Sequence, residues 1–167
     1  MRKVVYLHGL ESNINCKKVK YLRKLGFNVL NPSMDYYDKK CFIDVQYQIQ
    51  EFQPDLIIGS SMGGWFAYLY GKYFETPVVL LNPALHSRSF EPDVDKWGCE
   101  LHSKIHLITG RNDDIIDPLK TVKLLNYSDP YDFNPNNHII GDWGHRTPIK
   151  GLEMFFKEYN YYLPKVA

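Results

Sequence analysis

The sequence predicts a three-layer α/β/α fold built around a mainly parallel sheet of about six strands. Short, continuous apolar runs alternate along the chain with longer segments that have apolar residues at helical spacing. Continuous apolar strands of this kind are typical of a parallel sheet that is covered by helices on both faces. The chain has 167 residues, of which 44% are hydrophobic, and it contains no repeat or low-complexity linker. We therefore expect one domain, residues 1–167, with a substantial core.

The predicted strands are six short apolar runs, each followed by a glycine or by an Asn-Pro pair that ends it. They are residues 4–7, 27–30, 56–58, 77–81, 105–109 and 138–140. The predicted helices occupy residues 17–25, 42–52, 63–74, 118–125 and 149–159. Gly26 follows the first of these helices where a C-terminal glycine belongs, and Pro118 suits the first turn of the fourth.

Ligands of such sheets bind in the loops that follow the carboxyl ends of the strands. These loops are residues 8–13, 31–37, 59–64, 82–100, 110–117 and 141–148. The longest insertion, residues 85–101, contains Phe90 and Trp97 and is predicted to form a small cap-like segment. It is too short for a full lid domain, so we expect an open pocket for small substrates.

Composition excludes several classes of protein. Twenty basic and 19 acidic residues are dispersed along the chain and give a net charge of +1, unlike a nucleic-acid-binding surface. The three cysteines, Cys16, Cys41 and Cys99, have no zinc-site spacing and suit a reducing compartment. No apolar run reaches the ~20 residues of a membrane helix, and the first residues do not resemble a signal peptide. We expect a cytoplasmic protein without nucleic-acid or membrane partners; a homodimer is compatible with the sequence.

The loop after the third predicted strand carries a G-x-S-x-G motif centred on Ser61. A sharp turn from strand to helix projects such a serine above the sheet, and it requires small residues two positions before and after. Gly59 and Gly63 satisfy this requirement, which the neighbouring Ser60 does not meet. The motif therefore predicts Ser61 as a nucleophile, with the amide of Met62 as one donor of an oxyanion hole.

A serine hydroxyl needs a base, and in this architecture the chain order is serine, acid, histidine. His145 lies in the loop after the last predicted strand and is the candidate base, whereas His138 lies within that strand. The acid belongs in the loop after residues 105–109. We favour Asp113, while Asp114 and Asp117 remain alternatives that also suit turn or helix-cap roles.

The loop after the first strand should supply the second oxyanion donor, for which we select the Leu10 amide. Gly9 allows the backbone to approach the reacting group closely, and His8 is predicted to hydrogen-bond loop backbone. His102 and His106 lie four residues apart on a β-like stretch and do not predict a metal site. We predict neither a metal nor a cofactor.

The order of these motifs resembles the YqiA/YcfP-like small esterases, a UPF0227-type family of the α/β-hydrolase superfamily. The residues that carry the resemblance are Tyr6-Leu7-His8-Gly9-Leu10-Glu11-Ser12, Gly59-Ser60-Ser61-Met62-Gly63-Gly64-Trp65, Asn82-Pro83-Ala84, Thr109-Gly110 with Asp113, and Gly144-His145. The resemblance implies a compact α/β-hydrolase fold and carboxylic-ester hydrolysis by Ser61, Asp113 and His145, without a cofactor. The insertion of Arg111-Asn112 before Asp113 departs from the family pattern and leaves the acid open.

The expected substrate is a small-molecule ester with a short acyl group. Gly9, Tyr36, Trp65 and Trp143 are the candidate substrate-binding residues, chosen because of their loop positions. A thioesterase or an amidase would use the same triad, so both remain alternatives. A non-catalytic binding protein on the same scaffold also remains, whereas the chain lacks the phosphate-binding glycine spacing of nucleotide-binding α/β proteins.

Overall fold

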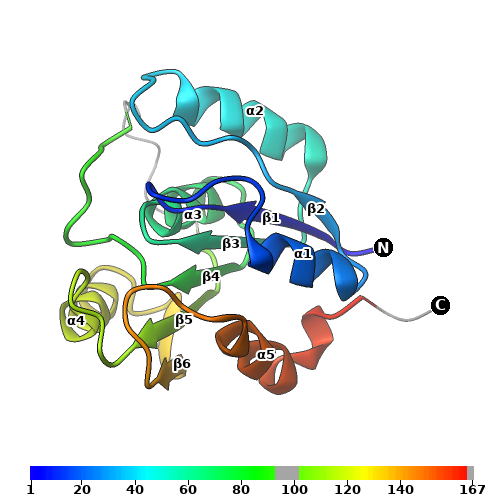
Figure 1. The fold of residues 1–167 in the computed structure, drawn as a ribbon. Helices are drawn as coiled ribbons and strands as arrows, with labels where there is room; N and C mark the ends of the chain where they lie inside the picture. Colours follow the sequence, from blue (N-terminus) through cyan, green and yellow to red (C-terminus); the bar gives the residue numbers. More distant parts are fainter. Residues whose placement is uncertain (93–101, 165–167) are drawn as a thin grey trace.

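A computed structural model describes residues 1–92 and 102–164 (Figure 1). Its centre is a six-stranded sheet in which every strand pair is parallel. The strands are β1 (Lys3–Leu7), β2 (Asn28–Leu30), β3 (Leu56–Ser60), β4 (Val78–Leu81), β5 (Ile105–Gly110) and β6 (Phe133–Gly141). The helices are α1 (Lys17–Lys24), α2 (Cys41–Phe52), α3 (Met62–Tyr73), α4 (Pro118–Ser128), α5 (Ile149–Glu158) and the short 3₁₀ helix η1 (Asn160–Tyr162).

The strand order, β2-β1-β3-β4-β5-β6, contains one reversal of direction. From β1 the chain moves outward to β2, then crosses back to β3 on the other side of β1, and continues in that direction to β6. The loops that leave β1 and β3 therefore diverge, and they open a crevice at the carboxyl ends of these two strands. This is where open α/β sheets bind their ligands.

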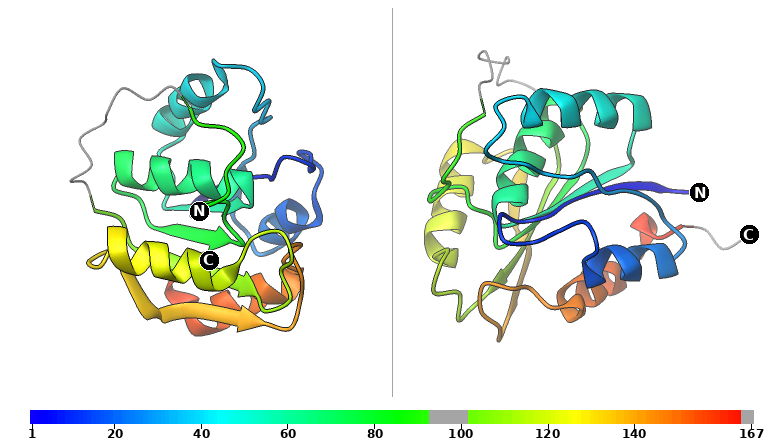
Figure 2. Two further views of the ribbon diagram at one scale, coloured as in Figure 1. Left: turned by 90° about the vertical axis from the view of Figure 1, so that its left-hand side faces the viewer. Right: turned by 45° about the horizontal axis from the view of Figure 1, so that its top comes forward.

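Two hydrophobic layers cover the sheet, because successive side chains of each strand point to opposite faces. Val5 and Leu7 of β1 join the layer under α2, α3 and α4, whereas Val4 and Tyr6 join the layer under α1 and α5. The views in Figure 2 agree, with α2 and α3 on one side of the sheet and α1 beside α5 on the other. The predicted three-layer arrangement and parallel sheet are thereby confirmed.

Three details differ from the sequence-based expectations. The last strand is longer than predicted, since β6 begins at Phe133 and includes Pro135, which the edge position of the strand allows. Helix α4 continues to Ser128, and η1 was not predicted. Phe90 of the predicted cap-like insertion 85–101 packs edge-on against Tyr37, whereas Trp97 lies outside the described residues.

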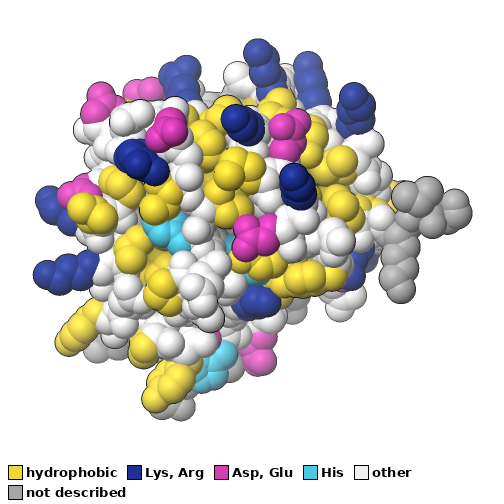
Figure 3. Space-filling view, turned by 90° about the horizontal axis from the view of Figure 1, so that it is seen from below, with side chains coloured by type: hydrophobic (Ala, Val, Ile, Leu, Met, Phe, Trp, Pro, Cys, Tyr) yellow, Lys and Arg dark blue, Asp and Glu magenta, His cyan; other side chains and the backbone are white. Residues whose placement is uncertain are grey.

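The surface bears charges of both signs. On the face drawn in Figure 3, acidic and basic side chains are interspersed with hydrophobic ones. In the part of the chain that the structure describes, none of the helices combines the length and the apolar character that crossing a membrane requires.

Candidate active site

Ser61 lies at the junction of β3 and α3 in a strained backbone conformation. Its φ is 54° and its ψ is −118°, which side-chain-bearing residues rarely adopt. Surrounding bonds hold this conformation: the Ser61 amide donates to Leu81 O at 2.9 Å, and Ser61 O accepts from the amides of Gly64 and Ala84. These bonds anchor Ser61 to the end of β4 and to the start of α3, and Ser61 lines a cavity at the crevice.

The two motif glycines are required by close backbone packing. A Cβ on Gly63 would lie 2.3 Å from Leu7 O and 2.5 Å from His8 O. A Cβ on Gly59 would lie 2.2 Å from Gly63 O. Helix α3 can thus pack directly against β1 and β3 only because both positions lack side chains.

The structure brings Ser61, His145 and Asp113 into one hydrogen-bonded chain. Nε2 of His145 lies 2.9 Å from Oγ of Ser61, and Nδ1 of His145 lies 3.0 Å and 3.2 Å from the two carboxylate oxygens of Asp113. The Asp113 side chain is fully buried, whereas that of His145 is 17% exposed. A proton on Nδ1 bonds to the carboxylate, which leaves Nε2 free to accept the Ser61 proton.

Asp113 is held in place by the loop that carries it. One carboxylate oxygen accepts the amides of Ile115 and Ile116, each at 2.9 Å. Of the three candidate acids, only Asp113 contacts His145: Asp117 caps α4 by accepting from the amides of residues 119 and 120, and Asp114 is exposed. The geometry thus favours Asp113.

Asn82 braces the loop that carries His145. Its side-chain amide lies 2.6 Å from His145 O and 3.1 Å from Gly144 O, and its carbonyl oxygen accepts from the amide of Gly110 at 2.8 Å. Asn82 is 1% exposed and has a φ of 41°, which asparagine tolerates better than most residues. One side chain thereby ties the ends of β4 and β5 to the histidine loop.

Leu10 and Met62 both line the cavity, and within the described residues neither of their amides donates to a protein acceptor. They are therefore available to a ligand oxygen. Gly9 lies close to Ser61, since a Cβ added to Gly9 would lie 3.1 Å from the Cβ of Ser61. His8 holds the same loop: Nδ1 lies 2.8 Å from Gly9 O, and Nε2 accepts from the Met34 amide at 3.3 Å.

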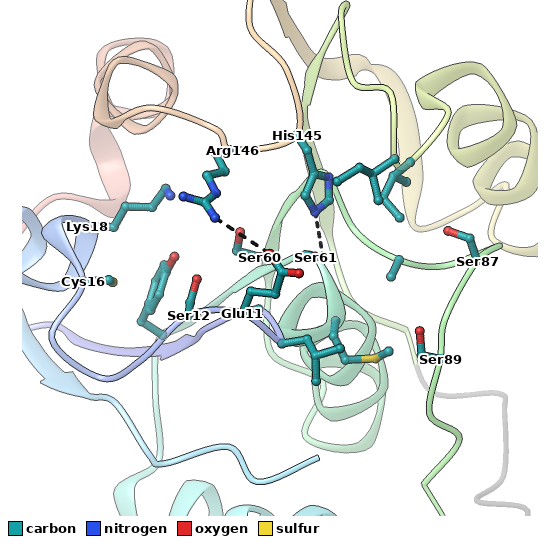
Figure 4. A pocket seen from close by; sticks show the side chains of 17 residues that line it. Glu11, Ser12, Cys16, Lys18, Ser60, Ser61, Ser87, Ser89, His145 and Arg146 are labelled. Carbon is teal, nitrogen blue, oxygen red and sulfur yellow. Dashed lines mark hydrogen bonds and ion pairs between the residues drawn. The ribbon is translucent and has the colours of Figure 1, made fainter. Parts of the chain in front are cut away.

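The cavity around Ser61 has a volume of about 280 Å³, which suits a small ligand. Figure 4 shows Lys18, Arg146 and Glu11 on one side of Ser61, and Ser87 and Ser89 on the other. Aliphatic and methionine side chains of the lining belong to Leu10, Met62, Ala84, Ile115 and Ile116.

The three predicted aromatic substrate-binding residues are not among those that line this cavity. Tyr36 is buried under α3, where its hydroxyl donates to His8 O and its ring packs edge-on against Phe66. Trp65 stacks with Tyr68 and lies under the guanidinium of Arg88. Trp143 packs its indole ring against Gly141, where a Cβ would lie 1.8 Å from the ring. Large aromatic surfaces gain more from burial than an open pocket offers.

The other four histidines have structural partners, and His86 Nε2 lies 3.0 Å from Asp117 O. His138 lies 2.8 Å from the Thr109 hydroxyl, and His102 lies 3.0 Å from Asp132. His106 is buried, 3.2 Å from the Tyr162 hydroxyl. Among the described residues, no group of three or more histidine, cysteine or acidic side chains is arranged to hold a metal ion.

The protein has the α/β-hydrolase fold, which solved structures of α/β hydrolases share over nearly its whole length. Three of the solved structures that match nearly the whole chain come from a bacterium, the mouse and an archaeon. A member of the α/β serine hydrolases without lid from Xanthomonas campestris has 15% identity, covers 99% of this chain and 84% of its own, and gives a TM-score of 0.67. Mouse alpha/beta hydrolase domain-containing protein 10 has 14% identity, coverages of 95% and 88%, and a TM-score of 0.70. A monoacylglycerol lipase from Paleococcus ferrophilus has 15% identity, coverages of 96% and 93%, and a TM-score of 0.66.

A family assignment follows from the sequence. The model of the family described as "Uncharacterised protein family (UPF0227)" matches residues 3–98, which is more than half of the chain. The chain belongs to this family, as its motifs predict. The matched region contains Ser61 and both predicted oxyanion donors, whereas Asp113 and His145 lie beyond it. A search of curated proteins gives no match.

Three residues at the site were missed by sequence reasoning as functional candidates. The sequence indicated only that Asn82 ends a strand. Its support of the His145 loop became visible from the contacts of its side chain with His145 O and the Gly110 amide. Arg146 directly follows the candidate base, and this adjacency was a usable signal. Lys18 is distant in sequence from every motif and reaches the cavity only through the packing of α1.

Proposed function

We propose that this protein is a serine hydrolase that cleaves small carboxylic esters with short acyl groups. The single observation that carries the proposal is the continuous chain of hydrogen-bonding distances from Ser61 Oγ through His145 to Asp113. Nucleophilic catalysis by serine requires this alignment of nucleophile, base and orienting acid.

In the proposed mechanism, His145 accepts the Ser61 proton while Oγ attacks the ester carbonyl. The negative charge that develops on the carbonyl oxygen is stabilised by the amides of Leu10 and Met62, which lack protein acceptors within the described residues. His145 then donates its proton to the leaving alcohol, and an acyl-enzyme forms on Ser61. Water, deprotonated by His145, hydrolyses this intermediate and restores the free serine.

The strained conformation of Ser61 supports catalysis over mere ligand binding. Strained backbone of this kind costs on the order of 1–3 kcal/mol and persists where the surrounding structure enforces it, commonly at active sites. The cavity volume of about 280 Å³ favours a short acyl group over a long lipid chain.

A fluorophosphonate probe tests the nucleophile directly. The wild-type protein should be labelled and Ser61→Ala should not, whereas Ser60→Ala, which removes the neighbouring hydroxyl, should still be labelled. Folded wild-type protein that resists the probe would remove the main support for the proposal.

Substrate class requires a second measurement. The protein should hydrolyse p-nitrophenyl acetate and butyrate faster than a p-nitrophenyl ester with a long acyl chain. It should also cleave oxygen esters faster than matched thioesters and anilides. A preference for thioesters or anilides would reassign the same site to a thioesterase or an amidase. A preference for long acyl chains would contradict the small-substrate assignment.

A further inference from the structure

Two cationic side chains lie beside Ser61 in the candidate active-site cavity. Lys18 comes from the first turn of α1, and Arg146 directly follows His145 in the chain. Figure 4 shows both on the same side of Ser61, with their side chains extending toward each other. The proposed ester hydrolysis assigns neither of them a role.

The charge of Lys18 has no counter-ion in the described part of the chain. The Lys18 ammonium makes no ion pair or hydrogen bond there. Burial lowers the pKa of Lys18, the nearby Arg146 charge lowers it further, and Cys16 acts in the opposite direction. A partly buried ammonium beside a second cation carries an electrostatic cost that a bound anion would relieve.

Nearby groups do little to neutralise this side of the cavity. Glu11 is the one acidic residue among its described lining residues, and its carboxylate lies 3.8 Å from Arg146. Both side chains are more than four-fifths exposed, so this ion pair is weak and an incoming anion can replace it. Tyr6 also lines the cavity, and burial raises its pKa, so its hydroxyl stays neutral.

The start of α1 adds to the positive potential. Its N-cap residue, Cys16, makes no side-chain cap, and the first turn contains no acidic residue. Cys16 and Lys18 both line the cavity, so the positive end of the helix dipole faces the same space. The helix end thus reinforces the positive potential of the two side chains.

We propose that Lys18 and Arg146 form an anion-binding subsite, and that preferred substrates are small esters bearing a carboxylate or phosphate group. This inference rests on the proposed function, because it locates the anion relative to Ser61. The Arg146 guanidinium can bind two oxygens of such a group in a fork, while the Lys18 ammonium acts as a compact point charge. The scissile ester carbonyl then lies between this subsite and the apolar lining.

Two matched substrate pairs test the subsite and distinguish which part of the ester carries the anion. For the acyl side, p-nitrophenyl hexanoate is compared with the p-nitrophenyl monoester of adipic acid, which has the same chain length and a terminal carboxylate. For the alcohol side, 1-butyrylglycerol is compared with its 3-phosphate. In at least one pair, the wild-type kcat/KM should be about tenfold higher for the anionic ester, the size expected for a charge-assisted hydrogen bond.

Variants then connect this preference to the two cations. Lys18→Gln and Arg146→Gln should each lower the anionic-to-neutral ratio of kcat/KM, by about tenfold for Lys18→Gln. Glu11→Gln, which removes the competing carboxylate, should raise the ratio. Lys20→Gln is the matched control, because Lys20 lies on the same helix, is exposed and does not line the cavity; it should leave the ratio unchanged.

The outcomes separate the two proposals. Hydrolysis of the neutral esters without preference for either anionic partner would overturn the subsite and leave the hydrolase proposal standing. A preference that persists in both Lys18→Gln and Arg146→Gln would also overturn it. Folded wild-type protein that hydrolyses none of the four esters would contradict the hydrolase proposal and the subsite together.

Discussion

The side-chain amide of Asn82 lies 2.6 Å from the backbone carbonyl of His145, although the two residues belong to different strand-end loops. The same side chain accepts the amide of Gly110, at the end of the strand that leads to Asp113. Asn82 therefore fixes the candidate base and the loop of its acid relative to each other. Ser61 connects to the same region through its amide, which donates to Leu81, the residue before Asn82.

Asn82→Gly should lower kcat substantially more than it changes KM. Glycine accepts the positive φ of this position without strain, so the variant removes the brace and spares the backbone conformation. A displaced His145 costs on the order of 10²-fold in rate, because proton transfer depends on alignment. Steady-state kinetics with a p-nitrophenyl ester, together with the melting temperature, provide the measurement.

Thr147→Val is the matched control for Asn82. It removes a single hydroxyl, 3.2 Å from the same amide, with little change in shape. Its effect on kcat should be small. An Asn82→Gly protein with a lower melting temperature and a wild-type kcat would show that the brace serves stability alone.

Replacing each of the three candidate acids in turn should identify the one that orients His145. Asp113→Asn should lower kcat by roughly 10²–10⁴-fold, because the amide no longer selects the correct tautomer of His145. Asp114→Asn and Asp117→Asn should retain the wild-type rate, since Asp114 is exposed and asparagine also caps helices well. A larger loss of kcat in either control than in Asp113→Asn would reassign the acid.

Gly63→Ala should destabilise the protein severely. The added methyl group would lie 2.3 Å from Leu7 O, and neither α3 nor β1 can move without disturbing the core. We expect a loss of about 3 kcal/mol or more in the free energy of unfolding, measured by urea denaturation. Gly144→Ala is the control: its nearest neighbour would be Asn112 O at 3.4 Å, an ordinary contact. Equal stability of the two variants would contradict the packing argument.

Acid should destabilise the fold through His106. Burial lowers its pKa to about 4, with the Lys104 charge acting in the same direction, from an ordinary value of 6.5. Between these pH values the unfolded chain binds a proton at this position and the folded chain does not, so the free energy of unfolding decreases as pH falls. Across this pH range, protonation of His106 in the unfolded chain lowers the free energy of unfolding by roughly 3 kcal/mol in total.

His106→Gln should flatten this pH dependence. Glutamine cannot take up a proton in the unfolded chain, so the contribution of His106 disappears from the pH 4–6.5 window. Urea denaturation at pH 7.5, 5.5 and 4.5 would compare the variant with the wild type. An equally steep loss of stability in the variant would assign the acid sensitivity to other groups.

Features that depend on local sequence were predictable. The apolar runs located the strands because a buried parallel strand needs apolar side chains on both faces, as β4 and β5 show. The motif around Ser61 was readable because its glycines meet a steric demand within a few residues. Chain order then placed Asp113 and His145, since both follow predicted strands at the same edge of the sheet.

Features that depend on tertiary packing were not predictable. Tyr36 lies in a strand-end loop, as a pocket residue would, yet its hydroxyl finds a partner in His8 O and the ring is buried. Lys18 reaches the cavity through the position of α1 against the sheet, which no local pattern encodes. The distances that favour Asp113 over Asp117 as the candidate acid likewise depend on tertiary structure.

The packing of Trp143 against Gly141 gives the site an intrinsic optical reporter. Trp143 precedes His145 by two positions in the same loop. The environment of its indole ring therefore depends on the position of the loop that carries His145. The difference in fluorescence emission between wild-type protein and Trp143→Phe isolates its signal from that of the other tryptophans. If phosphonylation of Ser61 or binding of a product acid shifts the loop that carries His145, the emission of Trp143 should change and should report the event in real time, without an attached dye.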